Sequence, residues 1–214
     1  MKKYKVYLFD FDYTLADSSL GIVTCFHDVL VRHGFRNVDD YAIKRTIGKT
    51  LEDSFSILTG EKNASLLLQY KNEYVKEADV HMTVNTFLFP ETEQVLTSLK
   101  KQDVKIGIIS TKYRYRIMEL LSKKLPEGCL DIVIGGEDVT EPKPSAQGVR
   151  LAMERLGIVD KSSVLYVGDS LVDAETAKNA GVDFMAVLHG MTTRKEFDGY
   201  PCVAVAENLK VLVE

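Results

Sequence analysis

The sequence predicts an α/β protein with a mostly parallel sheet and one inserted all-helical block. Short apolar runs that suit buried strands alternate with amphipathic segments that suit helices, and this alternation is typical of βαβ units. The alternation stops between residues 17 and 82, where the chain holds helical segments and no good strand. These two observations together predict a sheet domain that is interrupted by a helical module.

The strands and helices of the sheet domain follow one another in a regular order. Strands are expected at residues 6–9, 104–109, 132–134, 164–167 and 184–187, which are apolar runs rich in branched and aromatic side chains. Helices are expected from Pro90 to Lys101 and over residues 116–124, 145–156 and 171–180. Gly157 and Gly181 follow the last two of these helices at positions that favour a left-handed C-terminal residue.

The inserted block contains three expected helices, at residues 20–32, 50–58 and 64–78. Thr50 is a good N-cap for the second of them, and Gly60 ends it. The predicted domains are therefore residues 1–16 with 83–214 as the core and residues 17–82 as a cap. An insertion directly after the first strand is well placed to act as a lid over that strand's carboxyl end.

Bulk composition narrows the class of protein. The 214 residues are 45% hydrophobic and 27% charged, and the net charge of -4 gives no electrostatic reason to expect a nucleic acid or an anionic membrane as partner. No apolar run reaches the roughly 18 residues that a membrane span needs, and the first apolar stretch is too short for a signal peptide. The three widely spaced cysteines suit reduced thiols. We therefore expect a cytoplasmic protein.

Two carboxylates stand at the end of the first strand. Asp10 and Asp12 follow the apolar residues 6–9, at the edge of the sheet where open parallel α/β folds bind ligands. They share a side if the strand conformation continues through them. Two carboxylates that close repel each other unless a cation or a shared proton compensates. The spacing indicates a metal site, a proton-transfer pair, or both.

Polar residues also follow three further strands. Ser110 and Thr111 suit a phosphate oxygen, although both are ordinary helix caps as well. Lys143 lies between two prolines and could neutralise a phosphate, with a solvated surface lysine as the alternative. Asp169 and Asp173 lie about one helical turn apart, which suits either helix capping or an oxygen-only Mg²⁺ site.

The order of these groups resembles the haloacid dehalogenase superfamily of phosphohydrolases. Residues 10–15 (Asp-Phe-Asp-Tyr-Thr-Leu) resemble its first motif, residues 108–111 its second, Lys143-Pro144 its third and residues 168–173 its fourth. Gly34 and residues 47–49 are similar to the branch of phosphoglycolate phosphatase and β-phosphoglucomutase. Tyr13 and Ala146 depart from the pattern, which more often has Gly and Pro there.

The resemblance implies a Rossmann-like, doubly wound parallel core with an inserted helical cap. It implies a Mg²⁺-dependent phosphatase that acts on a small phosphate ester through an aspartyl-phosphate. It implies that Asp10 is the nucleophile and a metal ligand, and that Asp12 is the acid and base and a metal ligand through its carbonyl. Lys143 would stabilise charge, and Ser110 and Thr111 would bind the phosphate. Asp169 would be a metal ligand, and Asp173 would either bind the metal through water or orient Lys143.

Lys49 is the cap residue expected to touch substrate, with an exposed surface lysine as the alternative. Three rival functions stay open: a β-phosphoglucomutase-like phosphotransferase, an inorganic pyrophosphatase and, more distantly, a phosphate-binding regulator without turnover. A monomer is the expected state, with a dimer as the alternative.

Overall fold

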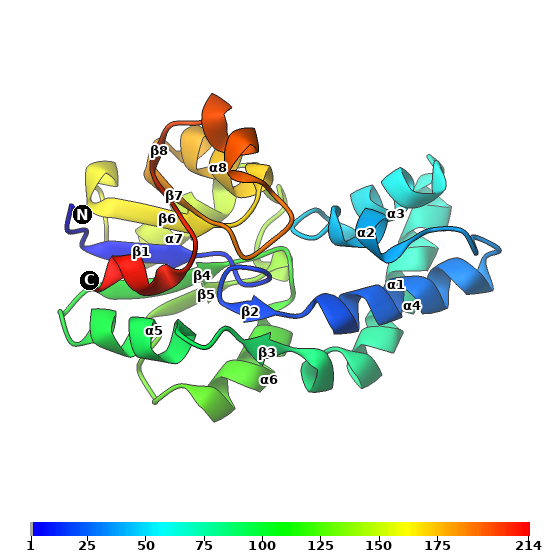
Figure 1. Ribbon diagram of the computed structural model, residues 1–214, viewed down its shortest axis with the longest axis horizontal. Helices are drawn as coiled ribbons and strands as arrows, with labels where there is room; N and C mark the ends of the chain where they lie inside the picture. The colour runs from blue at the N-terminus through cyan, green and yellow to red at the C-terminus, as the bar shows by residue number, and fades with distance from the viewer. Residues whose placement is uncertain (1) are drawn as a thin grey trace. The chain divides into compact units, whose positions relative to one another are not determined.

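The computed structural model describes residues 2–214, and these form two compact units. One unit contains the chain up to Ala16 together with Leu88–Glu214, and the other contains Asp17–Phe87. We call them the core unit and the cap unit. The core unit is built on the parallel sheet, and the cap unit is built on helices, as Figure 1 shows for each unit by itself.

The core sheet has six parallel strands in the order β5-β4-β1-β6-β7-β8. Their bounds are Val6–Phe9 for β1, Lys105–Ile109 for β4, Ile132–Ile134 for β5, Val164–Gly168 for β6, Asp183–Val187 for β7 and Cys202–Ala206 for β8. β1 pairs in parallel with both β4 and β6, so it lies at the centre. This arrangement confirms the predicted fold class.

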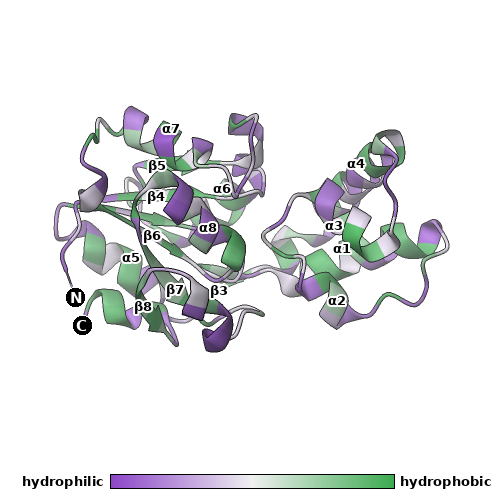
Figure 2. Cartoon of the chain, turned by 90° about the horizontal axis from the view of Figure 1, so that it is seen from above, coloured by the Kyte–Doolittle hydropathy of each residue, from purple (hydrophilic) through white to green (hydrophobic). Residues whose placement is uncertain are grey.

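Helices cover both faces of the sheet because side chains alternate along each strand. Tyr7 and Phe9 of β1 pack with α5 (Thr92–Lys100), α6 (Arg114–Lys124) and the 3-10 turn η5 (Leu209–Leu212). Val6 and Leu8 pack with α7 (Gln147–Arg155), α8 (Leu171–Ala180) and η4 (Arg194–Gly199). Figure 2 shows the resulting change from apolar to polar residues around these helices. The short turn η2 (Gly136–Asp138) lies in the connection from β5 to α7, and η3 (Lys161–Ser163) lies in the connection from α7 to β6.

In the core unit, the structure differs from the prediction at the starts of α5 and α7 and at the strand β8, among other places. α5 begins at Thr92 because residues 89–92 form a turn, in which the Thr92 N–H donates to the Phe89 carbonyl. α7 begins at Gln147 because the Ser145 N–H donates back to Pro142. The strand β8 escaped prediction because Cys202–Ala206 is a short, alanine-containing, partly exposed run at the edge of the sheet.

The cap unit has its own core. Its helices are α1 (Ser19–Arg32), α2 (Asp40–Lys44), α3 (Leu51–Thr59) and α4 (Ala64–His81), followed by the 3-10 turn η1 (Thr83–Asn85). Phe26 and Phe55 lie 4.7 Å apart between ring centroids, and Tyr74 packs against both. Thr50 caps α3 by accepting a hydrogen bond from the Asp53 N–H. The five-residue α2 had no sequence prediction, since so short a helix carries little periodicity.

The chain passes between the two units at two short strands that pair with each other. These are β2 (Ala16–Asp17) and β3 (Phe87–Leu88), which form a separate two-stranded sheet. Directly beside them in the core unit, the Leu15 carbonyl accepts hydrogen bonds from the Phe89 N–H at 3.1 Å and the Thr92 hydroxyl at 2.7 Å. The beginning and the end of the insertion are thus fixed next to each other.

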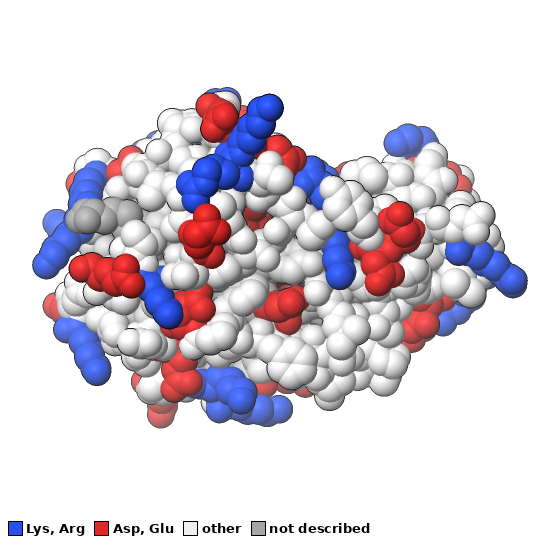
Figure 3. Space-filling model, in the orientation of Figure 1, with Lys and Arg blue, Asp and Glu red and all other residues white. Residues whose placement is uncertain are grey.

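Charges of both signs are interspersed on the face of the molecule that Figure 3 shows. This distribution agrees with the net charge of -4 and offers no continuous basic stripe on that face. Within residues 2–214, no helix combines the length and the apolarity required to cross a bilayer.

Candidate active site

The carboxyl ends of three adjacent strands supply the first group of site residues. β4, β1 and β6 are neighbours in the sheet, and each is followed at once by a polar residue: Ser110, Asp10 and Asp169. All three are buried, with exposed fractions of 5%, 1% and 5%. Parallel pairing brings the ends of these strands to one edge, so residues that are far apart in sequence meet there.

The loop after β1 turns sharply and keeps both of its carboxylates buried. The Asp10 N–H donates to Val167 at 2.9 Å, and the Phe11 carbonyl accepts from the N–H groups of Leu15 and Ala16. Tyr13 has a φ of 56°, in the left-handed region that favours glycine. This conformation explains why glycine suits the position, and here tyrosine adopts it.

Lys143 lies between two buried carboxylates. Its Nζ is 2.9 Å from Asp10 Oδ1 and 2.7 Å from Asp173 Oδ1, and the three side chains are at most 4% exposed. Burial alone would lower the pKa of Lys143, but the two carboxylates outweigh it and hold that pKa well above its usual value. Lys143 therefore carries a positive charge directly against Asp10.

Both oxygens of Asp173 are engaged in hydrogen bonds. Oδ1 accepts from Lys143 and from the Tyr166 hydroxyl at 3.0 Å, and Oδ2 accepts from the Ser170 hydroxyl at 2.5 Å and the Ser170 N–H at 3.2 Å. The Ser170 hydroxyl in turn accepts from the Asp173 N–H, which forms a capping box at the start of α8. These contacts favour the role of orienting Lys143.

Asp10, Asp169 and Asp173 form a buried acidic cluster. One carboxylate oxygen from each lies within 4.8 Å of the others. Burial and then the neighbouring carboxylates hold the pKa of Asp169 well above its usual value, and burial is the main cause that raises the pKa of Asp10 to about 7. Within residues 2–214, Asp10 Oδ2 is the buried side-chain oxygen that lacks a hydrogen-bond partner. Crowded carboxylates with an unpartnered oxygen fit a hard divalent cation such as Mg²⁺.

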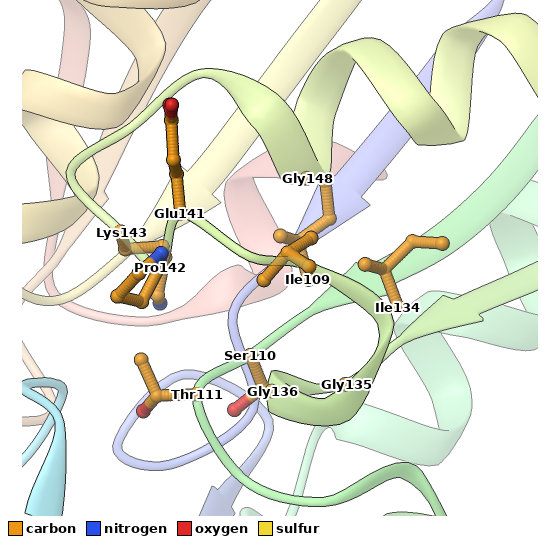
Figure 4. Close-up of a pocket in the computed structure, with 11 residues that line it drawn as sticks. Ile109, Ser110, Thr111, Ile134, Gly135, Gly136, Glu141, Pro142, Lys143 and Gly148 are labelled. Carbon is orange, nitrogen blue, oxygen red and sulfur yellow. The ribbon is translucent and has the colours of Figure 1, made fainter.

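The loop after β4 brings two hydroxyl side chains to the pocket that Lys143 also lines. Ser110 and Thr111 line a small pocket together with Lys143, as Figure 4 shows. Gly136 also lines it, and a Cβ at that position would lie only 2.4 Å from the Thr111 carbonyl oxygen. The close approach of this glycine lets its N–H donate to the Lys112 carbonyl at 3.1 Å, which fixes the loop.

The family model described as haloacid dehalogenase-like hydrolase matches residues 7–187, a span that contains every one of these core-unit residues. The chain belongs to the haloacid dehalogenase-like hydrolases.

Relatives place this hydrolase in one branch of the family. The crystal structure of a protein from Bacteroides fragilis, described as a haloacid dehalogenase-like hydrolase, is 58% identical and has a TM-score of 0.96, covering 98% of this chain and 100% of that one. A Neisseria gonorrhoeae protein named phosphoglycolate phosphatase is 31% identical over 85% of this chain and 79% of its own. A Bacillus velezensis protein named Pyrophosphatase PpaX is 30% identical over 84% and 81%. This hydrolase is a phosphatase of that branch and carries an inserted helical cap.

The structure of this hydrolase also contains site residues that the sequence patterns did not indicate. Lys112 Nζ lies 2.6 Å from Asp12 Oδ1, and the Tyr166 hydroxyl donates toward Asp173 from the middle of β6. The sequence offered one signal for Lys112, which is a lysine two positions after the serine that follows a strand. Nothing in the sequence indicated a site role for Tyr166, because it lies within an apolar run that is typical of a buried strand.

Lys49 belongs to the cap unit of this hydrolase. It lines a pocket of that unit together with Asp39, Arg45 and Thr46, at the turn where Gly48 has a φ of 95°. Its expected contact with substrate stays a prediction.

Gly190 of this hydrolase lies against Asp169, and a larger residue at this position should disrupt the acidic cluster. A Cβ at this position would lie 2.0 Å from Asp169 Oδ2 and 3.1 Å from the Tyr13 Cβ. We expect Gly190→Ala to displace Asp169, weaken Mg²⁺ binding in calorimetric titration by about tenfold or more, and lower activity in parallel. Gly199→Ala is the matched control, since nothing lies within 4 Å of its Cβ position. Unchanged Mg²⁺ affinity in Gly190→Ala would contradict the assignment of Asp169 as a ligand.

Proposed function

We propose that this hydrolase is a Mg²⁺-dependent phosphatase that hydrolyses small phosphorylated metabolites through a phosphorylated Asp10. The observation that carries the proposal is the environment of Asp10 at the carboxyl edge of the sheet. Lys143 contacts its Oδ1, its Oδ2 has no hydrogen-bond partner within residues 2–214, and Asp169 and Asp173 lie beside it. A carboxylate has two oxygens, so one oxygen of Asp10 could hold the cation while the other attacks phosphorus.

The reaction would run in two steps. An oxygen of Asp10 attacks phosphorus, the bond from phosphorus to the ester oxygen breaks, and Asp12 donates a proton to the departing oxygen. Asp12 then removes a proton from water, the water oxygen attacks phosphorus, and the bond between phosphorus and Asp10 breaks. Inorganic phosphate leaves and both carboxylates return to their initial states.

The remaining residues stabilise charge and hold the phosphoryl group. Lys143 lies against the nucleophile, where it offsets the negative charge that accumulates on the phosphoryl oxygens. Ser110 and the Thr111 N–H would bind those oxygens. When bound, Mg²⁺ supplies further positive charge, and Asp10, Asp169 and the Asp12 carbonyl would hold it.

Two substrate candidates have support from relatives. The names phosphoglycolate phosphatase and Pyrophosphatase PpaX belong to proteins that are 31% and 30% identical to this chain. We therefore propose phosphoglycolate first and inorganic pyrophosphate second.

Metal removal and a substrate panel test this proposal together. The panel contains p-nitrophenyl phosphate, phosphoglycolate, pyrophosphate and a hexose 1-phosphate, each assayed for released phosphate. We expect hydrolysis with Mg²⁺, loss of hydrolysis with EDTA, and recovery when Mg²⁺ is added in excess. Formation of hexose 6-phosphate in place of free phosphate would contradict a hydrolase and support phosphoryl transfer. Phosphate binding without turnover of any substrate would support a regulator.

A further inference from the structure

Lys112 forms a partly buried ion pair with Asp12 that the proposed reaction leaves without a role. The distance from Nζ to Asp12 Oδ1 is 2.6 Å, and each side chain is 9% exposed. The two residues are 100 positions apart in sequence, so the pair is a product of the fold. The Lys112 ammonium also lies 5.2 Å from the centroid of the Phe11 ring.

The backbone of Lys112 is fixed on both sides. Its N–H donates to the Ser110 hydroxyl at 3.2 Å, and its carbonyl accepts from Gly136 at 3.1 Å. A lysine whose backbone and ammonium are both held has lost most of the conformational freedom of a surface lysine. It is therefore preorganised to bind an anion at a defined position.

The proposed reaction places the leaving group beside this ammonium. Asp12 donates its proton to the departing oxygen, so that oxygen must come within hydrogen-bonding distance of Asp12. Because Lys112 already contacts Asp12 Oδ1, its ammonium is then within about 5–8 Å of the departing oxygen, the span of two hydrogen bonds joined by one carboxylate group.

The charge of Lys112 makes this proximity selective. Its ammonium is largely shielded from water, and charges that are shielded from water interact more strongly than charges in bulk water. A leaving group with its own negative charge is attracted by this ammonium, whereas a neutral alcohol is not.

We propose that Lys112 determines specificity for substrates whose leaving group is anionic close to the departing oxygen, as a carboxylate or a second phosphate is. The inference rests on the proposed function, in which Asp10 attacks and Asp12 protonates. It concerns only residues of the core unit.

A matched pair of substrates tests the inference. 2-Phosphoglycolate and 2-hydroxyethyl phosphate are similar in size, but only the first has an anionic leaving group. We expect the wild-type enzyme with Mg²⁺ to prefer 2-phosphoglycolate in kcat/KM. Lys112→Met should reduce that preference by about 10- to 100-fold, the scale of one hydrogen bond to a charged group. Lys112→Arg keeps the charge and should retain most of the preference.

Lys101→Met is the control, since Lys101 is an exposed lysine of the same unit and should leave the preference unchanged. An equal loss on both substrates in Lys112→Met would overturn the inference and leave the proposed function intact, because Lys112 would then only support Asp12. A wild-type enzyme without preference would also overturn it, and this comparison requires no variant to fold. If the wild-type enzyme hydrolyses neither substrate nor p-nitrophenyl phosphate, the proposed function fails and the inference fails with it.

Discussion

Asp10→Asn is expected to lower kcat by at least about 10⁴-fold, the scale that applies when the nucleophile of a covalent mechanism is removed. The amide has nearly the shape of the carboxylate but cannot attack phosphorus. The fold should persist, because burial disfavours the negative charge at this position and has already raised the pKa of Asp10 to about 7. We expect a Tm within about 4 °C of the wild type.

The measurement is Mg²⁺-dependent hydrolysis of p-nitrophenyl phosphate, with circular dichroism to verify the fold. Asp198→Asn is the matched control, since Asp198 is exposed in the same unit and should change neither quantity. A second readout is the trapping of phosphate on the protein by acid quench, which Asp10→Asn should abolish. Activity within tenfold of the wild type would rule out Asp10 as the nucleophile.

Lys143→Met should have the largest effect on stability. The substitution leaves Asp10 and Asp173 buried without the ammonium that lies 2.9 Å and 2.7 Å from them. Breaking a buried ion pair in this way costs about 3–5 kcal/mol, because the remaining charge is uncompensated. The variant should also lose at least about 10²-fold in kcat, since the charge beside the proposed nucleophile, Asp10, is gone.

The stability measurement is urea unfolding in the presence of EDTA, so that a bound cation does not compensate the carboxylates. Lys123→Met, at an exposed position of α6, is the control and should change the free energy of unfolding by no more than about 0.5 kcal/mol. A midpoint equal to that of the wild type would show that the carboxylates do not depend on Lys143.

The sequence was sufficient to predict the architecture of the core unit because its central strands are buried on both faces. Such strands are continuous apolar runs, and the polar residue that ends each one is conspicuous, as Asp10 and Asp169 are. β8 lacks this contrast because it is a partly exposed edge strand. The helices that have clear caps were predicted best, as Thr50 and Gly181 illustrate.

The contacts inside the site could not be predicted in the same way. The pairing of Lys112 with Asp12 depends on where two strand-end loops meet, and no local pattern records that distance. The orientation of Asp173 depends on Tyr166, whose hydroxyl is hidden within an apolar strand. Sequence spacing indicates candidate site residues, whereas their contacts follow from the packing of the sheet and its loops.

The pairing of β2 with β3 has a consequence for how this protein could have arisen. Because the two ends of the inserted segment are neighbours, the core unit can accept or lose residues 17–87 without rearranging its sheet. The cap unit also has its own aromatic core. One segment of the gene, which encodes the cap unit, could therefore diverge or be exchanged in evolution while the core unit stays constant.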